Sequence, residues 1–520
     1  MLAFFLALLT GVATACTSGA TGQSSDTSAQ NGSNQVLTWA SDDIADTFDP
    51  AVASSQPELQ FAKATYETLV NYDSTARKLT PGLARAWSES ENATKVTLTL
   101  QRGVTFHDGS KLTPQGVVAS LQRTIDIGKG EAFLLSNVKS MSPEGSDSVT
   151  IELKKPDASF LYGLQRIFIA SDRAIKEHAG SDNGTSWFST HEAGSGPYML
   201  KSFKPASQLI LTKYQGYWRG WTGDHVSEYV INVVDPATEV LQIKQGTADL
   251  ATAIPTDDAY SMQNTSGVQV DHYPGSPFYL LLNSGKAPFN NAKIREAVSL
   301  AVDYNAINEQ IMHGWAGKLT GPLPDWVADS NNASPPKYAP AEAKKILAEA
   351  GYNSSNPLQF TFLYFNGWTF EQTIATVLQA DLAQIGVKVT VKGVPWATFT
   401  EQVGNPHTRP DMAACAVYVP TPTPGPVLTA SFDPASEGQW SYLGYNNPAV
   451  TKLLDKASNA TNATEQASLY REAQAQLVNG HAAIWLMVMP DVFVTTDRVH
   501  GLQHDPSWGL VPNYYDISLQ

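Results

Sequence analysis

The sequence is poor in cysteine, with only Cys16 and Cys415 in 520 residues. This excludes a fold held together by a disulfide framework, which small secreted domains need because their cores are too small. A chain of this length buries enough apolar surface to do without disulfides, and it is too long for one core. We expect two or three lobes, in which Cys415 is a small buried side chain within the apolar run 412–417.

Signatures of catalysis are also missing. The His-Glu pair at 191–192 is followed by AGSG, so it is no H-E-x-x-H zinc motif, and no phosphate-binding G-x-x-x-x-G-K-[ST] loop occurs. The GSG at 194–196 lacks the spacing of a nucleophile elbow, and 136–139 fits S-x-x-K without its partner motifs. The ten histidines are scattered without ligand-like spacing. We expect no enzymatic activity, no metal site and no cofactor.

Positive charge is scarce as well. The 34 Lys and Arg stand against 49 Asp and Glu, which gives a net charge of −15 at pH 7. An acidic surface repels phosphate backbones and anionic lipid, so we expect no nucleic-acid partner. Apolar residues make up 42% and charged residues only 16% of the chain, as in a well-buried globular protein.

The first fifteen residues predict an export signal. The run from Leu2 to Val12 is almost entirely apolar, too short to span a bilayer and typical of a signal-peptide core. The small residues before Cys16 resemble the cleavage box of bacterial lipoproteins, in which that cysteine becomes the lipidated first residue. We assign 1–15 to the signal peptide and the polar stretch 16–35 to a lipidated tether at the cell surface or periplasmic side of the membrane. An ordinary secretory signal cleaved nearby is the alternative.

Strand and helix patterns alternate along the rest of the chain. Residues 36–40 and 96–106 are typical of strands, the second because Val and Leu alternate with Thr and Lys. Thr113-Pro114 predicts the N-cap and first residue of a helix. Further helices are predicted after Asn291, from Pro340, over 374–385, after Asn447 and over 465–479, and strands over 387–391 and 484–489. The pattern indicates an α/β chain with mixed sheets and no transmembrane helix after the signal.

Several short segments stand in an order that one family shares. LARAWSESENATKVTLTLQRGVTFHDGSKLTPQGVVASLQR (83–123) resembles the signature region of the solute-binding proteins of peptide-type ABC importers. This is the family of oligopeptide-, dipeptide- and nickel-binding lipoproteins, extracellular solute-binding protein family 5. GSGPYMLKSF (194–203), APFNNAKIREAVSLAVD (287–303) and GYNNPAVTKLL (444–454) follow in the family's order. The resemblance extends from about residue 36 to the C-terminus.

This resemblance implies an α/β fold of the periplasmic-binding-protein type (type II, cluster C), a two-lobe clamshell with an extra inserted domain. Lobe I would comprise 36–66, 191–289 and 498–520, lobe II the insertion 67–190, and lobe III 290–497. Crossings near 290 and 497 would form the hinge, and closure would bury the ligand. Such proteins pass an unaltered ligand to the permease of an ABC importer, and we expect a monomer.

The segment FDPAVASSQPE (48–58) is the first predicted contact with a ligand. It aligns with the family's first crossing segment, which lies beside a bound peptide as a neighbouring strand. Ser54, Ser55 and Gln56 fall at those places, where hydroxyl and amide groups offer hydrogen bonds without selecting one side chain. A plain surface turn is the alternative.

Three aromatic residues are further candidates for ligand contact. Trp368, Trp396 and Tyr418 stand at the edges of predicted elements, beside segments that face the cleft in the family. Rigid aromatic surfaces with a polar tip suit varied ligands, although packing inside the lobe would explain the same residues. We assign Trp87, Trp218 and Trp485 to packing.

Residues 418–426, YVPTPTPGP, predict a stiff extended loop after the apolar run, because proline cannot continue a helix or a central strand. Many peptide-binding relatives have Asp-Tyr-x-x-Pro here, and the aspartate pairs with the peptide's free ammonium. The resemblance places 420–424 at that position, without a carboxylate. We expect a ligand that lacks a free ammonium or presents it elsewhere, with Thr421 and Thr423 as neutral hydrogen-bonding groups. Asp411 or Asp433 would supply the clamp if the alignment is shifted.

Together these features predict a substrate-binding lipoprotein that captures a peptide, or another small polar solute of peptide size, for a peptide-type ABC importer. Within the family, a receptor for a metal chelate or a glycoside is the alternative. A secreted hydrolase and a sensor that signals through a partner are the alternatives from other classes.

Overall fold

The computed structural model describes residues 35–331, 334, 336–437 and 444–520. The predicted signal peptide, Cys16 and nearly all of the predicted tether therefore lie outside the described residues. Among the helices of the described ranges, none combines the length and the hydropathy that crossing a membrane requires.

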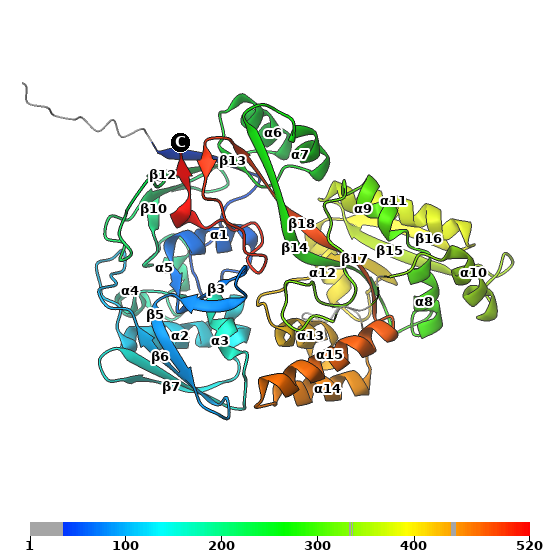
Figure 1. The fold of residues 1–520 in the computed structure, drawn as a ribbon, viewed down its shortest axis with the longest axis horizontal. Coiled ribbons are helices and arrows are strands. Elements are labelled where there is room, and N and C mark those ends of the chain that lie inside the picture. The colour runs from blue at the N-terminus through cyan, green and yellow to red at the C-terminus, as the bar shows by residue number, and fades with distance from the viewer. Residues whose placement is uncertain (1–34, 332–333, 335, 438–443) are drawn as a thin grey trace, which may run out of the picture. The chain divides into compact units, whose positions relative to one another are not determined.

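Residues 35–520 are built around one ten-stranded sheet (Figure 1). Strands β1, β12 and β13 run parallel to one another, as do β15, β16 and β17, whereas β14 is antiparallel to both β17 and β18, so the sheet is mixed as predicted. In sheet order the strands are β10 (Tyr198–Lys204), β11 (Gln208–Lys213), β12 (Glu228–Val233), β1 (Val36–Ser41), β13 (Leu250–Ala251), β18 (Ala483–Thr496), β14 (Val268–Leu282), β17 (Met412–Ala416), β15 (Gln359–Phe365) and β16 (Lys388–Val394).

Two long strands, β14 and β18, join the two ends of this sheet. Figure 1 shows them running from the elements around β1 to the elements around β15. They pair from Val268 opposite Thr496 to Leu281 opposite Ala483, and the register shifts between Pro274 and Pro277. Pro274 faces Pro490. Neither residue has an N–H to donate, so the ladder is weakest at this point.

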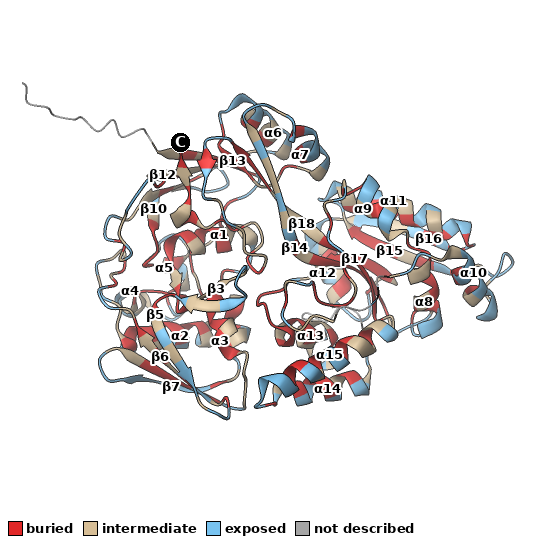
Figure 2. Cartoon of the chain, in the orientation of Figure 1, coloured by how far each residue is buried: buried red, intermediate tan, exposed pale blue. Residues whose placement is uncertain are grey.

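Helices cover both faces of the sheet at the β15 end. Phe278, Leu280 and Leu282 of β14 belong to one hydrophobic cluster, and Tyr279 and Leu281 belong to another, because side chains alternate along a strand. The first cluster takes residues from α8 (Ala292–Leu300), α10 (Pro340–Glu349) and α11 (Thr369–Gln384). The second takes residues from α12 (Trp396–Gly404), α13 (Pro424–Phe432), α14 (Pro448–Ser458) and α15 (Ala463–Asn479). Figure 2 shows buried residues on the strands and on the helix faces that meet them.

The other end of the sheet packs against α1 (Gln56–Thr65) and the C-terminal segment. A separate four-stranded sheet, in the order β5 (Ala84–Glu89), β6 (Lys95–Leu100), β8 (Ser148–Leu153), β7 (Val138–Glu144), packs on α2 (Pro114–Ile127). The buried residues of that core all fall between Leu69 and Ile169. Residues 69–169 therefore form a core of their own within the chain.

Most predicted elements form where the sequence indicated. Thr113 caps α2 and accepts the backbone N–H of Gly116 at 3.0 Å. Asn291 and Asn447 cap α8 and α14 in the same way. Cys415 is buried, as predicted, and burial raises the pKa of its thiol to about 12.

Two local predictions are wrong. The strand predicted over 96–106 ends at Leu100, and Gly103 has φ +78°, a left-handed conformation that a strand cannot contain. The loop predicted over 418–426 ends earlier, because Pro424 is the first residue of α13 and Thr423 is its N-cap. Proline is tolerated in the first helical turn, where its missing N–H would have no partner in the helix.

Candidate functional site

The predicted contact segment 54–56 begins helix α1. Ser55 is the N-cap, and the carboxylate of Glu58 accepts the backbone N–H of Ser54 at 2.8 Å and that of Ser55 at 2.9 Å. Gln56 donates from Nε2 to the backbone oxygen of Trp508 at 3.2 Å. The Ser55 side chain accepts the N–H of Glu58 at 3.4 Å, so these bonds within and beside α1 hold the segment in place.

A buried ion pair fixes the turn that leads into this segment. The Asp49 carboxylate accepts two hydrogen bonds from the Arg123 guanidinium, at 2.6 and 2.8 Å, and the two side chains are 0% and 4% exposed. Asp49 Oδ1 also accepts the backbone N–H of Ala51 at 3.0 Å. Arg123 lies on α2, so the pair ties the turn at 49–53 to the four-stranded sheet and its helix.

Two of the predicted aromatic contacts lie at the carboxyl ends of β15 and β16. Trp396 is 53% exposed and Trp368 is 38% exposed. Phe365, the last residue of β15, meets both indoles edge to face with centroid distances of 5.6 Å. We call Phe365, Trp368 and Trp396 the aromatic ledge. Ligand crevices in α/β sheets open at the carboxyl ends of parallel strands, which is where this ledge lies.

The third predicted aromatic residue, Tyr418, links the two ends of the molecule. It follows β17, and its hydroxyl donates to Oε1 of Glu131 and accepts from the guanidinium of Arg166. Arg166 also donates to Oε1 of Glu131 at 3.0 Å. The side chains of Arg166 and Glu131 are 0% and 7% exposed. We call Glu131, Arg166 and Tyr418 the clasp.

Residues near Trp508 hold the clasp in place. Arg166 donates from Nη1 to the backbone oxygen of Ser507 at 3.2 Å, and its guanidinium lies 3.8 Å from the centroid of the Trp508 ring. Gly130 lets the loop of Glu131 approach the 51–53 turn, since a Cβ there would lie 2.8 Å from the oxygen of Ala53. The clasp therefore stands beside the segment that carries Ser54, Ser55 and Gln56.

The clasp contains polar atoms without partners. Within the described ranges, Glu131 Oε2, Arg166 Nε and both amide atoms of the adjacent Gln165 are buried and make no hydrogen bond. Burying such groups unpaired is costly, and folded proteins leave few of them. Burial raises the pKa of the Tyr418 hydroxyl well above its usual value of 10, with Arg166 lowering it and Glu131 raising it. The clasp and the adjacent Gln165 thus hold a carboxylate oxygen, an amide and a guanidinium N–H that are buried without partners.

The threonines of the proline-rich loop lie deeper than the aromatic ledge. Thr421 and Thr423 are 1% and 7% exposed, and their hydroxyl oxygens lie 2.9 Å apart. The two aspartates considered as alternative clamps already have partners. Asp411 pairs with Lys286 at 3.1 Å and accepts the N–H of Thr361, and Asp433 accepts the N–H of Ala435. The carboxylate that reaches this loop is that of Glu131, from a distant part of the chain.

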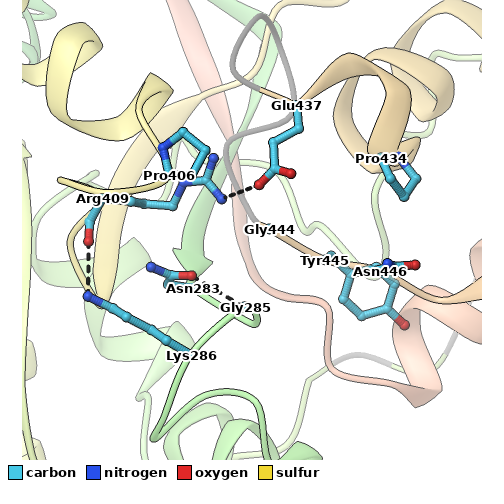
Figure 3. Close-up of a pocket in the computed structure, with 10 residues that line it drawn as sticks. All are labelled: Asn283, Gly285, Lys286, Pro406, Arg409, Pro434, Glu437, Gly444, Tyr445 and Asn446. Atoms are coloured by element: carbon cyan, nitrogen blue, oxygen red, sulfur yellow. Dashed lines mark hydrogen bonds and ion pairs between the residues drawn. The ribbon is translucent and has the colours of Figure 1, made fainter.

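A separate hollow of about 340 Å³ is lined by Asn283, Arg409, Glu437 and their neighbours, and none of the predicted contacts lines it (Figure 3). Arg409 borders it, donating from Nη1 to Glu437 at 3.1 Å and from Nε to the oxygen of Val403 at 3.1 Å. Lys286 donates to the backbone oxygen of Arg409 at 3.0 Å, as Figure 3 shows. These contacts occupy the buried Arg409 side chain with partners from its own part of the chain. No group of three or more His, Cys, Asp or Glu side chains in the described ranges is placed to hold a metal ion.

Sequence reasoning missed Glu131, Gln165, Arg166 and Trp508. One signal was available, because Arg166 interrupts the apolar stretch FLYGLQRIFIA, and an arginine in such a run is rarely buried without a partner. The identity of that partner depends on contacts between residues 252 positions apart, which no local pattern contains.

Comparison with known proteins places this arrangement in a family. The model of the bacterial extracellular solute-binding proteins, family 5, matches residues 78–466. The chain is 29% identical over 489 residues to the probable D,D-dipeptide-binding periplasmic protein DdpA of Escherichia coli strain K12, covering 91% of this chain and 92% of that one. It is 27% identical over 533 residues to heme-binding protein A of Haemophilus influenzae, with 96% of each chain covered.

Solved structures confirm the predicted fold class. The periplasmic binding protein DppA of Helicobacter pylori, in complex with the peptide STSA, superposes with a TM-score of 0.79 at 22% identity. The match covers 93% of this chain and 98% of that one. From the family match over most of its length, this chain is a member of the bacterial extracellular solute-binding proteins, family 5.

Proposed function

We propose that this chain is the substrate-binding subunit of a peptide-type ABC importer. It captures a peptide, or another small polar solute of peptide size, between two halves that close around it, and it delivers the ligand unaltered to the permease. The clasp is the observation that carries this proposal, since the buried Glu131 and Arg166 meet the partly exposed Tyr418 and retain unpaired polar atoms. Among the relatives, dipeptide-binding and glutathione-binding proteins support a peptide as the ligand.

The lobes follow the division expected from the family resemblance. Lobe I comprises 36–66, 191–289 and 498–520, lobe II comprises 67–190, and lobe III comprises 290–497. The separate core at 69–169 supports lobe II as an insertion. The long strands β14 and β18 support a hinge between lobe III and the other two lobes, and Pro274 opposite Pro490 favours bending there rather than at the crossings expected near 290 and 497.

The ligand lies between lobe III and the other lobes. From lobe I, the side chains of Ser54, Ser55 and Gln56 contact it. From lobe III, Trp368 and Trp396 of the aromatic ledge and the loop with Tyr418, Thr421 and Thr423 contact it. The ledge supports this assignment, because large indole faces stay exposed at the carboxyl ends of β15 and β16.

We further infer that Glu131 replaces the carboxylate that is absent from residues 420–424. Its Oε2 is buried without a partner, and its Oε1 already bonds the first residue of that loop, Tyr418. A ligand ammonium bound at Oε2 would give this buried oxygen the hydrogen bond that it lacks, whereas Arg166 already pairs with Oε1. A peptide would thus present its free amino group to lobe II rather than to lobe III.

The chain is anchored outside the cytoplasmic membrane as a monomer. Residues 1–15 act as the signal peptide, Cys16 carries the lipid, and residues up to 35 form the tether. Growth with radioactive palmitate tests the anchor, since the label should appear in the wild-type protein and be lost in Cys16→Ser. Label retained by that variant would refute the anchor without affecting the binding function.

Solution scattering and calorimetry with short peptides test the capture mechanism. Free tripeptides should bind with measurable heat and reduce the radius of gyration, and mass spectrometry should recover them unchanged. N-acetylated peptides should bind at least about tenfold more weakly, because a hydrogen bond to a charged group contributes ~1.5–3 kcal/mol. Glu131→Gln should abolish that difference. A ligand that is recovered cleaved, or a protein that binds no peptide and does not compact, would refute the function.

A further inference from the structure

A second and larger cavity, of about 940 Å³, adjoins the clasp, because Trp508 lines it and also lies 3.8 Å from the Arg166 guanidinium. Its lining residues in the described ranges fall in 63–82, at 101, 168 and 197, in 217–219, at 273, in 502–505, at 508 and in 511–516. None of them lies between 274 and 501, the part of the chain that contains the aromatic ledge and Tyr418. Figure 1 shows the C-terminal segment passing α1 toward β3 (Val70–Asp73), two of the elements that border the cavity. The cavity therefore does not depend on closure of the β15 end.

Lys63 brings an unpaired positive charge to this cavity. It stands in the last turn of α1, and its Nζ lies 4.3 Å from the centroid of the Trp508 ring. Within the part of the chain that the structure describes, its ammonium makes no hydrogen bond and no ion pair within 4.0 Å. Burial lowers the pKa of Lys63 to about 8, with Asp505 and Glu67 raising it and Arg166 lowering it further. An ammonium group is strongly hydrated in water, so an anion that enters the cavity would replace lost interactions.

The other charged residues of the lining limit the charge of that anion. Arg219 is a second cation in the lining, with its guanidinium 4.2 Å from the centroid of the Tyr515 ring. Glu67, Asp73, Asp505 and Asp516 outnumber the two cations, so a phosphate or a dicarboxylate would meet more repulsion than attraction. Glu67 already accepts hydrogen bonds from Trp218 and Tyr217, and Asp505 accepts two from Ser507. A single negative charge is enough to pair the Lys63 ammonium that lies over Trp508.

Aromatic side chains form part of the remaining walls, beside polar ones. Tyr72, Trp218, Tyr273 and Trp508 all line the cavity, and the Trp508 ring already lies beneath the Lys63 ammonium. Flat aromatic walls favour a flat apolar body, because ring stacking adds to the gain from burial. A hydrophilic anion such as acetate would leave these walls uncovered.

We infer that this cavity is a binding site for a monocarboxylate with an aromatic or otherwise flat apolar body. The carboxylate pairs with the Lys63 ammonium, and the apolar body lies against Trp508 and the neighbouring aromatic rings. The site does not rest on the proposed capture of peptides, because its lining belongs to the two ends of the chain and not to residues 274–501.

Calorimetric titration of the mature protein with phenylacetate tests this site, with phenethylamine and 2-phenylethanol as cationic and neutral probes of similar shape. Phenylacetate should bind, and the other two should bind at least about tenfold more weakly, because a charge-assisted hydrogen bond would be missing. Equal or tighter binding of phenethylamine, or no binding of phenylacetate at millimolar concentration, would overturn the proposal. This comparison uses the wild-type protein, so it does not depend on whether a variant folds.

The variant Lys63→Met keeps the apolar stem and removes the charge. It should bind phenylacetate at least about tenfold more weakly and should bind tripeptides as the wild type does. Lys244→Met is the matched control, since Lys244 also stands in the last turn of a helix, α6 (Pro236–Gln245), but is exposed and does not line the cavity. Unchanged phenylacetate affinity in Lys63→Met, or an equal loss in Lys244→Met, would overturn the assignment of the carboxylate to Lys63. Failure of tripeptide binding in every variant would concern the proposed function alone.

Discussion

Replacing Asp49 with asparagine keeps the shape of the side chain and removes the charge that compensates a buried guanidinium. Arg123 is 4% exposed on its side chain, and the remaining contacts of its head group are with the backbone oxygen of Asn183 at 2.6 Å and the ring of Phe188 at 4.4 Å. Neither contact neutralises its charge. Breaking a buried pair by removing one partner destabilises a protein by ~3–5 kcal/mol, because the other charge stays buried and unpaired.

This magnitude corresponds to a measurable change in melting temperature. Unfolding entropy is about 2.1 cal/mol/K per residue, which for residues 35–520 gives about 1 kcal/mol/K if they unfold together. Asp49→Asn should therefore lower the melting temperature by about 3–5 °C. Because Asp49 also fixes the turn before Ser54, we expect peptide affinity to fall by about tenfold in the same variant.

Differential scanning calorimetry of four proteins checks this reasoning. The double variant Asp49→Asn/Arg123→Met removes both charges and should recover most of the stability that Asp49→Asn loses, since an apolar replacement of a buried pair is often neutral. Lys176→Met is the control, because it breaks an exposed ion pair between Lys176 and Asp172. The Lys176 side chain is 69% exposed, so this variant should change the free energy of unfolding by less than about 1 kcal/mol. A loss below about 1 kcal/mol in Asp49→Asn, or a double variant less stable than the single one, would show that the pair is not energetically coupled.

Three further variants probe the clasp, a buried histidine and the aromatic ledge. Tyr418→Phe keeps the ring but removes the hydroxyl, so closure and tripeptide affinity should weaken by about tenfold in scattering and calorimetry; unchanged affinity would argue against the clasp. Burial would lower the pKa of His107, but Glu192 at 2.8 Å raises it above the usual 6.5. The contribution of the His107–Glu192 ion pair to the free energy of unfolding is therefore complete below about pH 6.5 and is lost as the pH rises through the folded-state pKa of His107. The stability difference between the wild type and His107→Gln in urea should thus shrink toward alkaline pH, and a constant difference would contradict the assignment. Trp396→Ala should change the free energy of unfolding by less than about 1 kcal/mol, because the indole is 53% exposed, yet weaken peptide binding by about tenfold; a stability loss without an affinity loss would assign Trp396 to packing.

The sequence predicted the local parts of the fold well. Caps such as Thr113, Asn291 and Asn447 mark helix starts through hydrogen bonds that span two or three residues, so the information lies within the segment itself. The proline-rich loop shows where such reasoning fails. Pro424 reads as a helix breaker, yet it begins α13, because the first turn of a helix does not use the N–H that proline lacks.

The candidate site was predicted only in part. Trp368 and Trp396 were predicted as ligand contacts, and the structure leaves both indoles exposed at the carboxyl ends of two strands. Glu131 and Arg166 were not, because their significance comes from contact with Tyr418 across 287 and 252 residues of sequence. Buried charge in one segment can be interpreted only when the segment that compensates it is known.

The proline pair in strands β14 and β18 has a mechanical consequence. Because Pro274 faces Pro490, rotation at this point breaks no backbone hydrogen bond between those two residues, while the register on either side can stay intact. If the proposed hinge lies here, bending would be confined to a few residues, and each half would move as a rigid body with its interior packing undisturbed. Such a joint would let the protein open and shut many times without partial unfolding, which a carrier that works in repeated cycles requires.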